Sequence, residues 1–326
     1  MIKIFRAASL ILSLAIPHAA GHADTLTIES SVIALHSEQA DIQTVGKLTY
    51  QGGLVLSSSD GNFGGFSSLD ISPDGKTLVS YSDRGYRLQA DLNYDSDGNL
   101  TNLSQSALEP VYGLDESILD KKKNRDAEAM AHLPDGSEIV AFERNHRLLK
   151  YALDSKTPTL ITAPEGLTNA PYNEGIEALT QLPDGRIFAL TQGMGDDDTR
   201  TGWIGTSDRW DALQYSFEDG YEPSGATALP SGDILILERR YRYVSGVAIR
   251  IRYISINDLN AATPETILNG ALIAELTPPF NIDNMEGIDA ISDSDGTIFI
   301  YLISDDNFDP DDQKTLLHMF SLESDF

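Results

Sequence analysis

Polar side chains stand at both ends of a short motif that recurs five times in this chain. Ahead of the five recurrences stand Ser67, Glu128, Glu177, Ser224 and Glu286, and behind them Asp83, Glu143, Gln192, Glu238 and Asp305. Converging carboxylates repel one another unless a cation neutralises them or some of them take up protons. Calcium suits such a set because it accepts roughly six to eight oxygen ligands in a flexible geometry. We therefore predict a calcium site whose ligands are Asp83, Glu128, Glu177, Glu238, Glu286 and Asp305.

Arginines accompany these carboxylates and predict an anionic substrate. Arg84, Arg144 and Arg239 each follow one of the acidic positions directly, and Arg125 precedes the second motif. The guanidinium group binds phosphate or carboxylate oxygens through two parallel hydrogen bonds. Cations and arginines together could neutralise a phosphoryl group while a carboxylate activates water. We expect Glu128, Glu177 and Glu143 to be the catalytic carboxylates that activate water. The alternative for each residue is a salt bridge that locks neighbouring elements.

The elements that position these residues are hairpins. Each motif is a short apolar strand, a Pro-Asp-Gly type of turn and a second apolar strand, with turn glycines at Gly75, Gly136, Gly185, Gly232 and Gly296. Asp-Gly between apolar runs is a strong hairpin signal, and spacings of 61, 49, 47 and 64 residues suit the four-stranded blades of a propeller. We predict an all-β fold, a single β-propeller of five or six blades. The alternative is a β-sandwich with chance Asp-Gly turns.

The chain ends offer a way to close the ring. Third strands are expected at 148–153, 248–256 and 316–322, and the last of these lies close to the final residue. Residues 47–56 can then supply the outer strand of the last blade, which would leave no open sheet edge. In a hairpin, the start of the first strand and the end of the second lie at the same end, so all the polar positions above should face one mouth of the central channel.

The first 23 residues resemble a secretory signal. Lys3 and Arg6 precede an apolar run that is too short to span a bilayer, and small residues lead to Ala23. Loss of this segment takes the formal charge from -27 to -29, which argues against nucleic acid or membrane insertion as partners. The chain has no cysteine, which excludes disulfides and thiolate chemistry. We expect a secreted or periplasmic, acidic, monomeric protein whose single domain spans residues 24–326.

Several stretches together resemble the phytase-like family described as having esterase-like activity. They are residues 64–70 with 82–85, 125–128 with 142–144, 173–179, 221–224 with 237–240, and 284–287, within a resemblance over roughly 45–324. The resemblance implies an exported propeller that hydrolyses phosphate or other esters. The sequence departs from a full acidic ring in two motifs, where Ser67 is the first polar position of one and Ala226 and Thr227 lie in the other.

Our leading hypothesis is therefore an exported, calcium-dependent phosphoesterase-like or esterase-like hydrolase acting on a small anionic ester at the channel mouth. Two alternatives remain open at this point. One is a non-catalytic propeller of the cell envelope that binds a ligand or protein at the same mouth. The other is a lactonase-like propeller with a single metal ion. Among the histidines, only His146 falls near the expected mouth, where it could act as a base.

Overall fold

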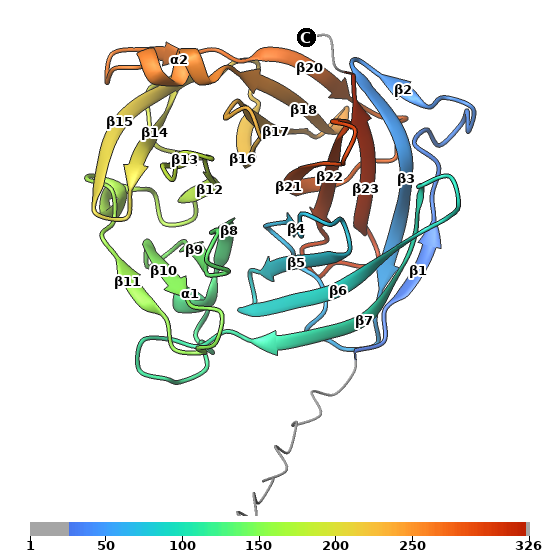
Figure 1. Cartoon of the computed structure of the whole chain (residues 1–326), viewed down its shortest axis with the longest axis horizontal. Coiled ribbons are helices and arrows are strands. Elements are labelled where there is room, and N and C mark those ends of the chain that lie inside the picture. The colour runs from blue at the N-terminus through green and yellow to red at the C-terminus, as the bar shows by residue number, and fades with distance from the viewer. Residues whose placement is uncertain (1–25, 324–326) are drawn as a thin grey trace, which may run out of the picture.

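The computed structural model describes residues 26–323 and shows a β-propeller of five blades around a central channel (Figure 1). The prediction of a propeller is confirmed, and the number of blades is five. The expected signal at residues 1–23 lies outside the described residues. Among the residues described, no helix is both long and apolar enough to cross a membrane.

Four blades follow one another along the chain, each running outward from the channel. Blade I contains β4 (Asp70–Ile71), β5 (Thr77–Ser82), β6 (Tyr86–Tyr94) and β7 (Leu100–Pro110). Blade II contains β8 (Ala127–His132), β9 (Glu138–Phe142), β10 (Arg147–Tyr151) and β11 (Thr159–Ile161). Blade III contains β12 (Ile176–Gln181), β13 (Ile187–Thr191), β14 (Thr199–Thr206) and β15 (Arg209–Ser216), with the short β19 (Ile267–Leu268) beside β15. Blade IV contains β16 (Glu222–Ala228), β17 (Ile234–Arg242), β18 (Gly246–Ile254) and β20 (Ala271–Leu276).

Blade V joins the two ends of the chain. It contains β21 (Asn284–Ser292), β22 (Ile298–Asp305), β23 (Thr315–Leu322), β3 (Leu48–Ser57) and β1 (Glu29–Val32), and β2 (Thr44–Val45) pairs with β3. The pairing of β3 with β23 runs from Leu48 opposite Leu322 to Leu56 opposite Thr315. The predicted closure is confirmed, and β1 adds a fifth strand outside it. The helical segments are short: α1 (Lys122–Arg125), α2 (Ile256–Ala261) and the 3₁₀ turn at Leu167–Asn169.

The core is divided among the interfaces between blades. Buried apolar side chains form five clusters, one between each pair of neighbouring blades. A middle strand is therefore covered on both faces, which explains why all five residues of β13 are apolar or threonine and all are buried. The predicted turns are confirmed as well, because all five turn glycines have φ between +69° and +90°, a range that glycine adopts without steric cost.

Candidate functional site

The inner strands carry a bulge at the same position in four blades. The pairing registers shift between Ala127 and Ala129, between Ile176 and Ala178, between Pro223 and Gly225, and between Met285 and Gly287, so the extra residues are Glu128, Glu177, Ser224 and Glu286. A bulge inserts one residue without a partner and re-aims its side chain. Three of the predicted acidic residues thus owe their direction to an irregularity of the strand. We call these four residues, with Ser67 of blade I, the bulge ring.

Blade I has a shorter regular inner strand, but an isolated bridge gives it the same arrangement at the mouth. Phe66 forms an isolated bridge with Ser82, and the backbone N–H of Ser67 donates to the carbonyl of Tyr81 over 3.0 Å. The regular ladder begins only at Asp70, opposite Val79, one step out of register with that bridge. Ser67 therefore occupies the place that a glutamate holds in blades II, III and V.

A second ring of side chains lies at the ends of the second strands. The backbone N–H groups of Asp83, Glu143 and Gln192 donate to the carbonyls of Gly65, Asp126 and Gly175, each two residues before its bulge position. In the other two blades the same place is paired as Asn284 opposite Asp305 and Glu222 opposite Arg239. The second ring therefore consists of Asp83, Glu143, Gln192, Arg239 and Asp305.

Glu238, which the sequence suggested as a metal ligand, lies one residue away from the second ring and faces elsewhere. It stands opposite Pro223, so it corresponds to Ser82, Phe142, Thr191 and Ser304 of the other blades. A shift of one residue along a strand turns a side chain to the opposite face. Glu143 and Gln192 lie seven residues after their turn glycines, and the same count from Gly232 leads to Arg239, although Asp83 and Asp305 lie eight and nine residues after theirs.

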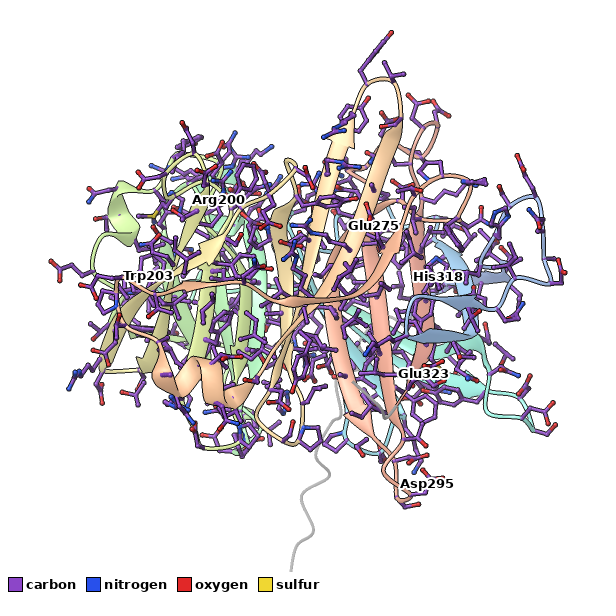
Figure 2. The ribbon with its side chains drawn as sticks, turned by 90° about the horizontal axis from the view of Figure 1, so that it is seen from above. Arg200, Trp203, Glu275, Asp295, His318 and Glu323 are labelled. Carbon is purple, nitrogen blue, oxygen red and sulfur yellow. The ribbon has the colours of Figure 1, made fainter. Side chains whose placement is uncertain are left out.

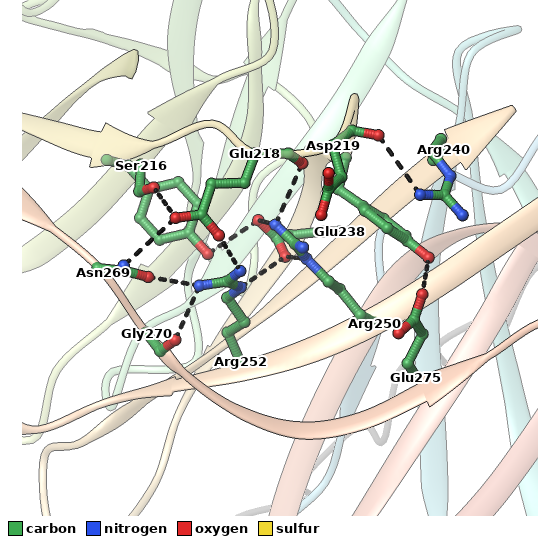
Figure 3. Close-up of polar contacts among 12 residues, drawn as sticks. Ser216, Glu218, Asp219, Glu238, Arg240, Arg250, Arg252, Asn269, Gly270 and Glu275 are labelled. Atoms are coloured by element: carbon green, nitrogen blue, oxygen red, sulfur yellow. Dashed lines mark hydrogen bonds and ion pairs between the residues drawn. The ribbon is translucent and has the colours of Figure 1, made fainter. Parts of the chain in front are cut away.

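The surroundings of Glu238 are those of a structural ion pair. Its side chain is fully buried and contacts both Arg250 and Arg252, the latter 3.3 Å away, while the hydroxyl of Tyr215 donates to it over 3.0 Å (Figure 3). The salt-bridge alternative raised from the sequence describes this residue, and we leave it out of the proposed ligand set.

The other predicted acidic residues gather at the mouth, together with one that sequence reasoning did not assign. Asp126, Glu128 and Glu143 each offer a carboxylate oxygen within 4.8 Å of the others, an arrangement that could hold a metal ion. Asp126 is almost fully buried and lies two residues before the bulge at Glu128. The signal that could have found it is this spacing, which places Asp126 on the same side of the strand as its bulge glutamate.

Burial raises the pKa of several of these carboxyl groups, and the charge of neighbouring carboxylates adds to the rise in most of them. Burial first, then the charge of Glu177, raise the pKa of Glu128 well above its usual value; burial and the charge of Glu143 do the same for Glu177. The pKa of Glu143 rises to about 8, and that of Asp83 to about 6, in each case through burial and then the charge of Asp126. Such a cluster either keeps protons at neutral pH or attracts a cation.

Asp305 and Glu286 complete the acidic set. Burial raises the pKa of Asp305 well above its usual value, with the charge of Glu286 adding to it. Burial also raises the pKa of Glu286, although Arg239 and Asn284 oppose this rise. Seven carboxyl groups therefore converge on the mouth: Asp83, Asp126, Glu128, Glu143, Glu177, Glu286 and Asp305.

Two of the predicted arginines contact this acidic set. Arg144 pairs with Asp126 and lies 3.4 Å from Glu143, while its backbone has a positive φ of 61°. Arg239 lies 3.6 Å from Glu286, and its Nε is buried without a hydrogen-bond partner. Two arginines against seven carboxyl groups leave the mouth with an excess of negative charge.

The other two predicted arginines lie beside the mouth. The Arg84 guanidinium stacks on the ring of Phe308, 3.2 Å from its centroid, and donates to the carbonyl of Gly61. Arg125 donates to the carbonyl of Asp120, and its Nε is buried without a partner. The structure thus brings Arg144 and Arg239 into the acidic set and leaves Arg84 and Arg125 at its edge.

His146 also lies near the mouth, as its sequence position suggested. Its Nε2 contacts the carbonyl of Pro171 over 3.0 Å, which assigns the proton to Nε2 and leaves Nδ1 as the acceptor. That Nδ1 is buried without a partner and lies only 2.9 Å from where a side-chain carbon on residue 175 would be. Gly175 is therefore the residue that admits the imidazole beside Glu143.

Below the two rings the channel is nearly filled. The cavity between the inner strands, lined on one side by Glu177 and Glu286, measures only about 10 Å³, roughly the space of one water molecule. The residues after the bulges are small, and a side-chain carbon on Gly287 would lie 2.8 Å from the backbone of Ser68. A ligand therefore cannot pass along the channel through the bulge ring.

Comparison with known proteins places the chain among phytase-like sequences. The family model described as phytase-like, with the esterase-like activity of phytase, matches residues 61–308, about three quarters of the chain. A search of the curated proteins found no match.

Solved structures with a similar course of the chain have low sequence identity. A protein of unknown function from Bacteroides thetaiotaomicron is 14% identical, with a TM-score of 0.49, and covers 91% of this chain and 76% of its own. One of unknown function from Dyadobacter fermentans is 13% identical, with a TM-score of 0.43 and coverages of 86% and 85%. Virginiamycin B lyase from Staphylococcus aureus is 10% identical, with a TM-score of 0.41 and coverages of 91% and 100%. At these values the likenesses carry no argument about activity.

Proposed function

Since this chain belongs to the phytase-like family, we propose that it is an exported, calcium-dependent hydrolase of small anionic esters that acts at the acidic mouth of the propeller. The observation that carries the proposal is the convergence of seven carboxyl groups, three of them turned to the channel by strand bulges, with only two arginines in contact with them. A fold gains nothing from such a concentration of like charge, which binding of a cation relieves.

The donor chemistry fits calcium. Asp126, Glu128 and Glu143 would hold the ion, because their oxygens already lie within 4.8 Å of one another. Asp83 and Asp305 are further oxygen donors, and the Oδ1 of Asp83 is buried without a partner. Bound calcium would supply positive charge that polarises an ester oxygen and lowers the pKa of a water molecule.

The arginines bind and orient the substrate in this proposal. Arg239 projects into the second ring, and its unpartnered Nε can donate to a phosphate or carboxylate oxygen. Arg144 is partly neutralised by Asp126 and Glu143, so we assign it a positioning role first. Arg84 and Arg125 would meet substrate groups that extend beyond the mouth.

Glu177 is the best candidate for proton transfer. Its carboxyl group lies in the bulge ring, and burial together with the charge of Glu143 raises its pKa, which favours the protonated form. A protonated carboxylic acid can donate a proton to the leaving oxygen of an ester as the bond breaks. Glu128, in the calcium ligand set, and Glu143 would instead be unprotonated when the ion is bound.

A direct test measures hydrolysis of a phosphomonoester and of a carboxylic ester, each in calcium and in chelator. We expect turnover in calcium only, and its loss in Glu128→Gln and in Glu177→Gln. Glu29→Gln, which changes an exposed carboxylate on β1, the outermost strand of blade V, serves as the matched control. If no ester is hydrolysed under either condition, the proposal fails, and the mouth is then that of a ligand-binding propeller. Turnover that survives both substitutions would refute our assignment of residues.

A lactonase-like, single-metal propeller is the second candidate. It is favoured by one observation: within residues 26–323, only Asp126, Glu128 and Glu143 form a carboxylate group close enough to share one ion. A lactone substrate added to the same assay separates the two activities, because a lactonase would open the lactone and leave the phosphomonoester intact.

The proposal also includes export and a monomeric state. Both depend on the sequence alone: a cleavable segment at residues 1–23 and an acidic surface that disfavours self-association. Recovery of the protein from the periplasm or the medium, with an N-terminus at Asp24, is the expected outcome.

A further inference from the structure

One hairpin extends beyond the propeller on the side of the mouth. The strands β17 and β18 pair with each other as far as Arg242 opposite Gly246. Their neighbours stop earlier, because β16 pairs with β17 only up to Arg239 and β20 pairs with β18 only from Ile249 onward. Residues 240–248 therefore form a two-stranded ribbon with no strand on either side. Figure 2 shows this ribbon standing above the face opposite to that of Asp295.

The tip of this ribbon is apolar and almost fully exposed. Tyr243 is 94% exposed, Val244 95% and Tyr241 64%. These three lie next to one another, whereas most other large exposed apolar residues are scattered over the described chain. A two-stranded ribbon is marginally stable in water, and exposed apolar side chains add nothing to its stability. The propeller has no structural need of this extension, so we look for its role in an interaction.

The same tip is cationic. Arg240 and Arg242 both donate to the backbone carbonyl of Asp219, and neither forms an ion pair with a carboxylate within residues 26–323. The Arg240 guanidinium also stacks on the buried ring of Tyr221, 4.2 Å from its centroid, so Arg242 is the exposed cation at the tip. A carbonyl oxygen accepts a hydrogen bond without cancelling the charge. The ribbon thus carries two positive charges on a protein whose formal net charge is -27.

The negative charge of the acidic mouth does not neutralise the positive charge at the tip of the ribbon. Four residues separate Arg239, in the second ring, from Tyr243, and a strand rises about 3.3 Å per residue. Arg242 therefore lies about 10 Å and Tyr243 about 13 Å along the strand from the second ring, both beyond the Debye length of about 8 Å at physiological ionic strength, whereas Arg240 lies beside the ring. The expectation from net charge, that the whole molecule avoids anionic membranes, does not apply to this projection.

We propose that the ribbon tip, residues 240–244, docks the protein on the surface of an anionic lipid bilayer. The interface of a bilayer accepts all three kinds of group at once: tyrosine rings lie at the headgroup level, the valine reaches the acyl boundary, and the arginines pair with anionic headgroups. A soluble polyanion would engage the arginines but leave Tyr243 and Val244 in water. This proposal is independent of the reaction at the mouth, although docking would turn the mouth toward the lipid.

The test is sedimentation of the protein with vesicles of equal parts phosphatidylglycerol and phosphatidylcholine, compared with phosphatidylcholine alone. We expect binding to the anionic vesicles only. The Arg240→Gln/Arg242→Gln variant should bind up to about thirtyfold more weakly, since an arginine near such a surface contributes about fivefold. The Tyr243→Ser/Val244→Ser variant should lose roughly tenfold or more. Thermal unfolding of each variant verifies that the propeller is intact.

The matched control is Leu153→Ser. Leu153 is also exposed, at 74%, but it lies against Gly136 at the turn end of blade II, on the opposite face. It should bind vesicles as the unaltered protein does. In a second measurement, the fluorescence of the tryptophan introduced by Val244→Trp should be quenched by lipids that are brominated on their acyl chains.

Three results would overturn the proposal. The first is no binding to anionic vesicles; the second is equal loss of binding in Leu153→Ser and in the tip variants. The third is a Val244→Trp signal that brominated lipid leaves unchanged while heparin, as a soluble polyanion, binds the arginines. That last result would identify an anionic polymer as the occupant in place of a membrane.

Discussion

A variant that lacks one carboxylate of the acidic mouth should be more stable than the unaltered protein in chelator and less stable than it in calcium. The perturbation is Glu128→Gln, which keeps the shape of the side chain. Two unit charges 4.8 Å apart repel by about 3.5 kcal/mol at an effective dielectric constant of ~20. Proton uptake limits the penalty, because keeping one glutamate with an unfolded-state pKa of 4.5 neutral at pH 7 costs about 3 kcal/mol.

In chelator at pH 7, we therefore expect the free energy of unfolding of Glu128→Gln to exceed that of the unaltered protein by about 1–3 kcal/mol. A folded-state pKa above the unfolded one means that the folded form of the unaltered protein is penalised above pH 4.5. The advantage of the variant should therefore shrink as the pH falls toward about 4.5.

Calcium should act in the opposite direction. At a hundredfold excess over its dissociation constant, an ion that binds only the folded protein adds about 2.7 kcal/mol. The unaltered protein should gain this stability and Glu128→Gln should not, so the two denaturation curves exchange order between chelator and calcium. Urea unfolding followed by circular dichroism measures both, with Glu29→Gln as the control. A variant that is less stable in chelator, or that keeps the full calcium effect, would refute the reasoning.

Two further predictions concern buried groups away from the mouth. Glu238→Ala leaves Arg250 buried without a carboxylate partner, while Arg252 keeps Glu218 at 2.7 Å, so the free energy of unfolding should fall by about 3 kcal/mol. The calcium affinity should stay unchanged, and urea unfolding and calcium titration measure the two quantities. Burial lowers the pKa of His318 to about 4, so as the pH falls below 6.5 the unfolded chain takes up this proton before the folded protein does. The free energy of unfolding should therefore decrease by about 3 kcal/mol between pH 6.5 and pH 4. His318→Gln should abolish that part of the pH dependence.

Much of the fold could be predicted because the signals are local. An Asp-Gly turn between two apolar runs specifies a hairpin wherever it occurs. The five turns predicted five or six blades, and the structure has five. The closure of the ring followed from the lack of a fourth strand after residue 322 together with a spare strand at residues 47–56. The extra strand β1 could not be predicted, because it pairs on the outer edge of blade V through exposed, mostly polar residues.

The site was predictable to the extent that it repeats with the hairpins. Glu128, Glu177 and Glu286 were found because each precedes an apolar strand at the same offset. Glu238 was grouped with the mouth because the alignment was made on residue type, an acid before Arg239, and not on the distance from the turn. Asp126 was missed because its contribution depends on where the bulge lies, and a bulge has no clear signature in a single sequence.

The bulge explains how one scaffold can carry different chemistry at each blade. The residue after each bulge is small (Ser68, Ala129, Ala178, Gly225 or Gly287) because the inner strands approach one another closely there. The bulge residue itself has no partner to satisfy, so its type is not constrained by the ladder. That freedom accounts for serine in blades I and IV and glutamate in the other three with no change in the fold. If so, Ser67→Glu should be accommodated without loss of the propeller and should strengthen calcium binding, whereas Ala129→Glu, one residue along, should prevent folding.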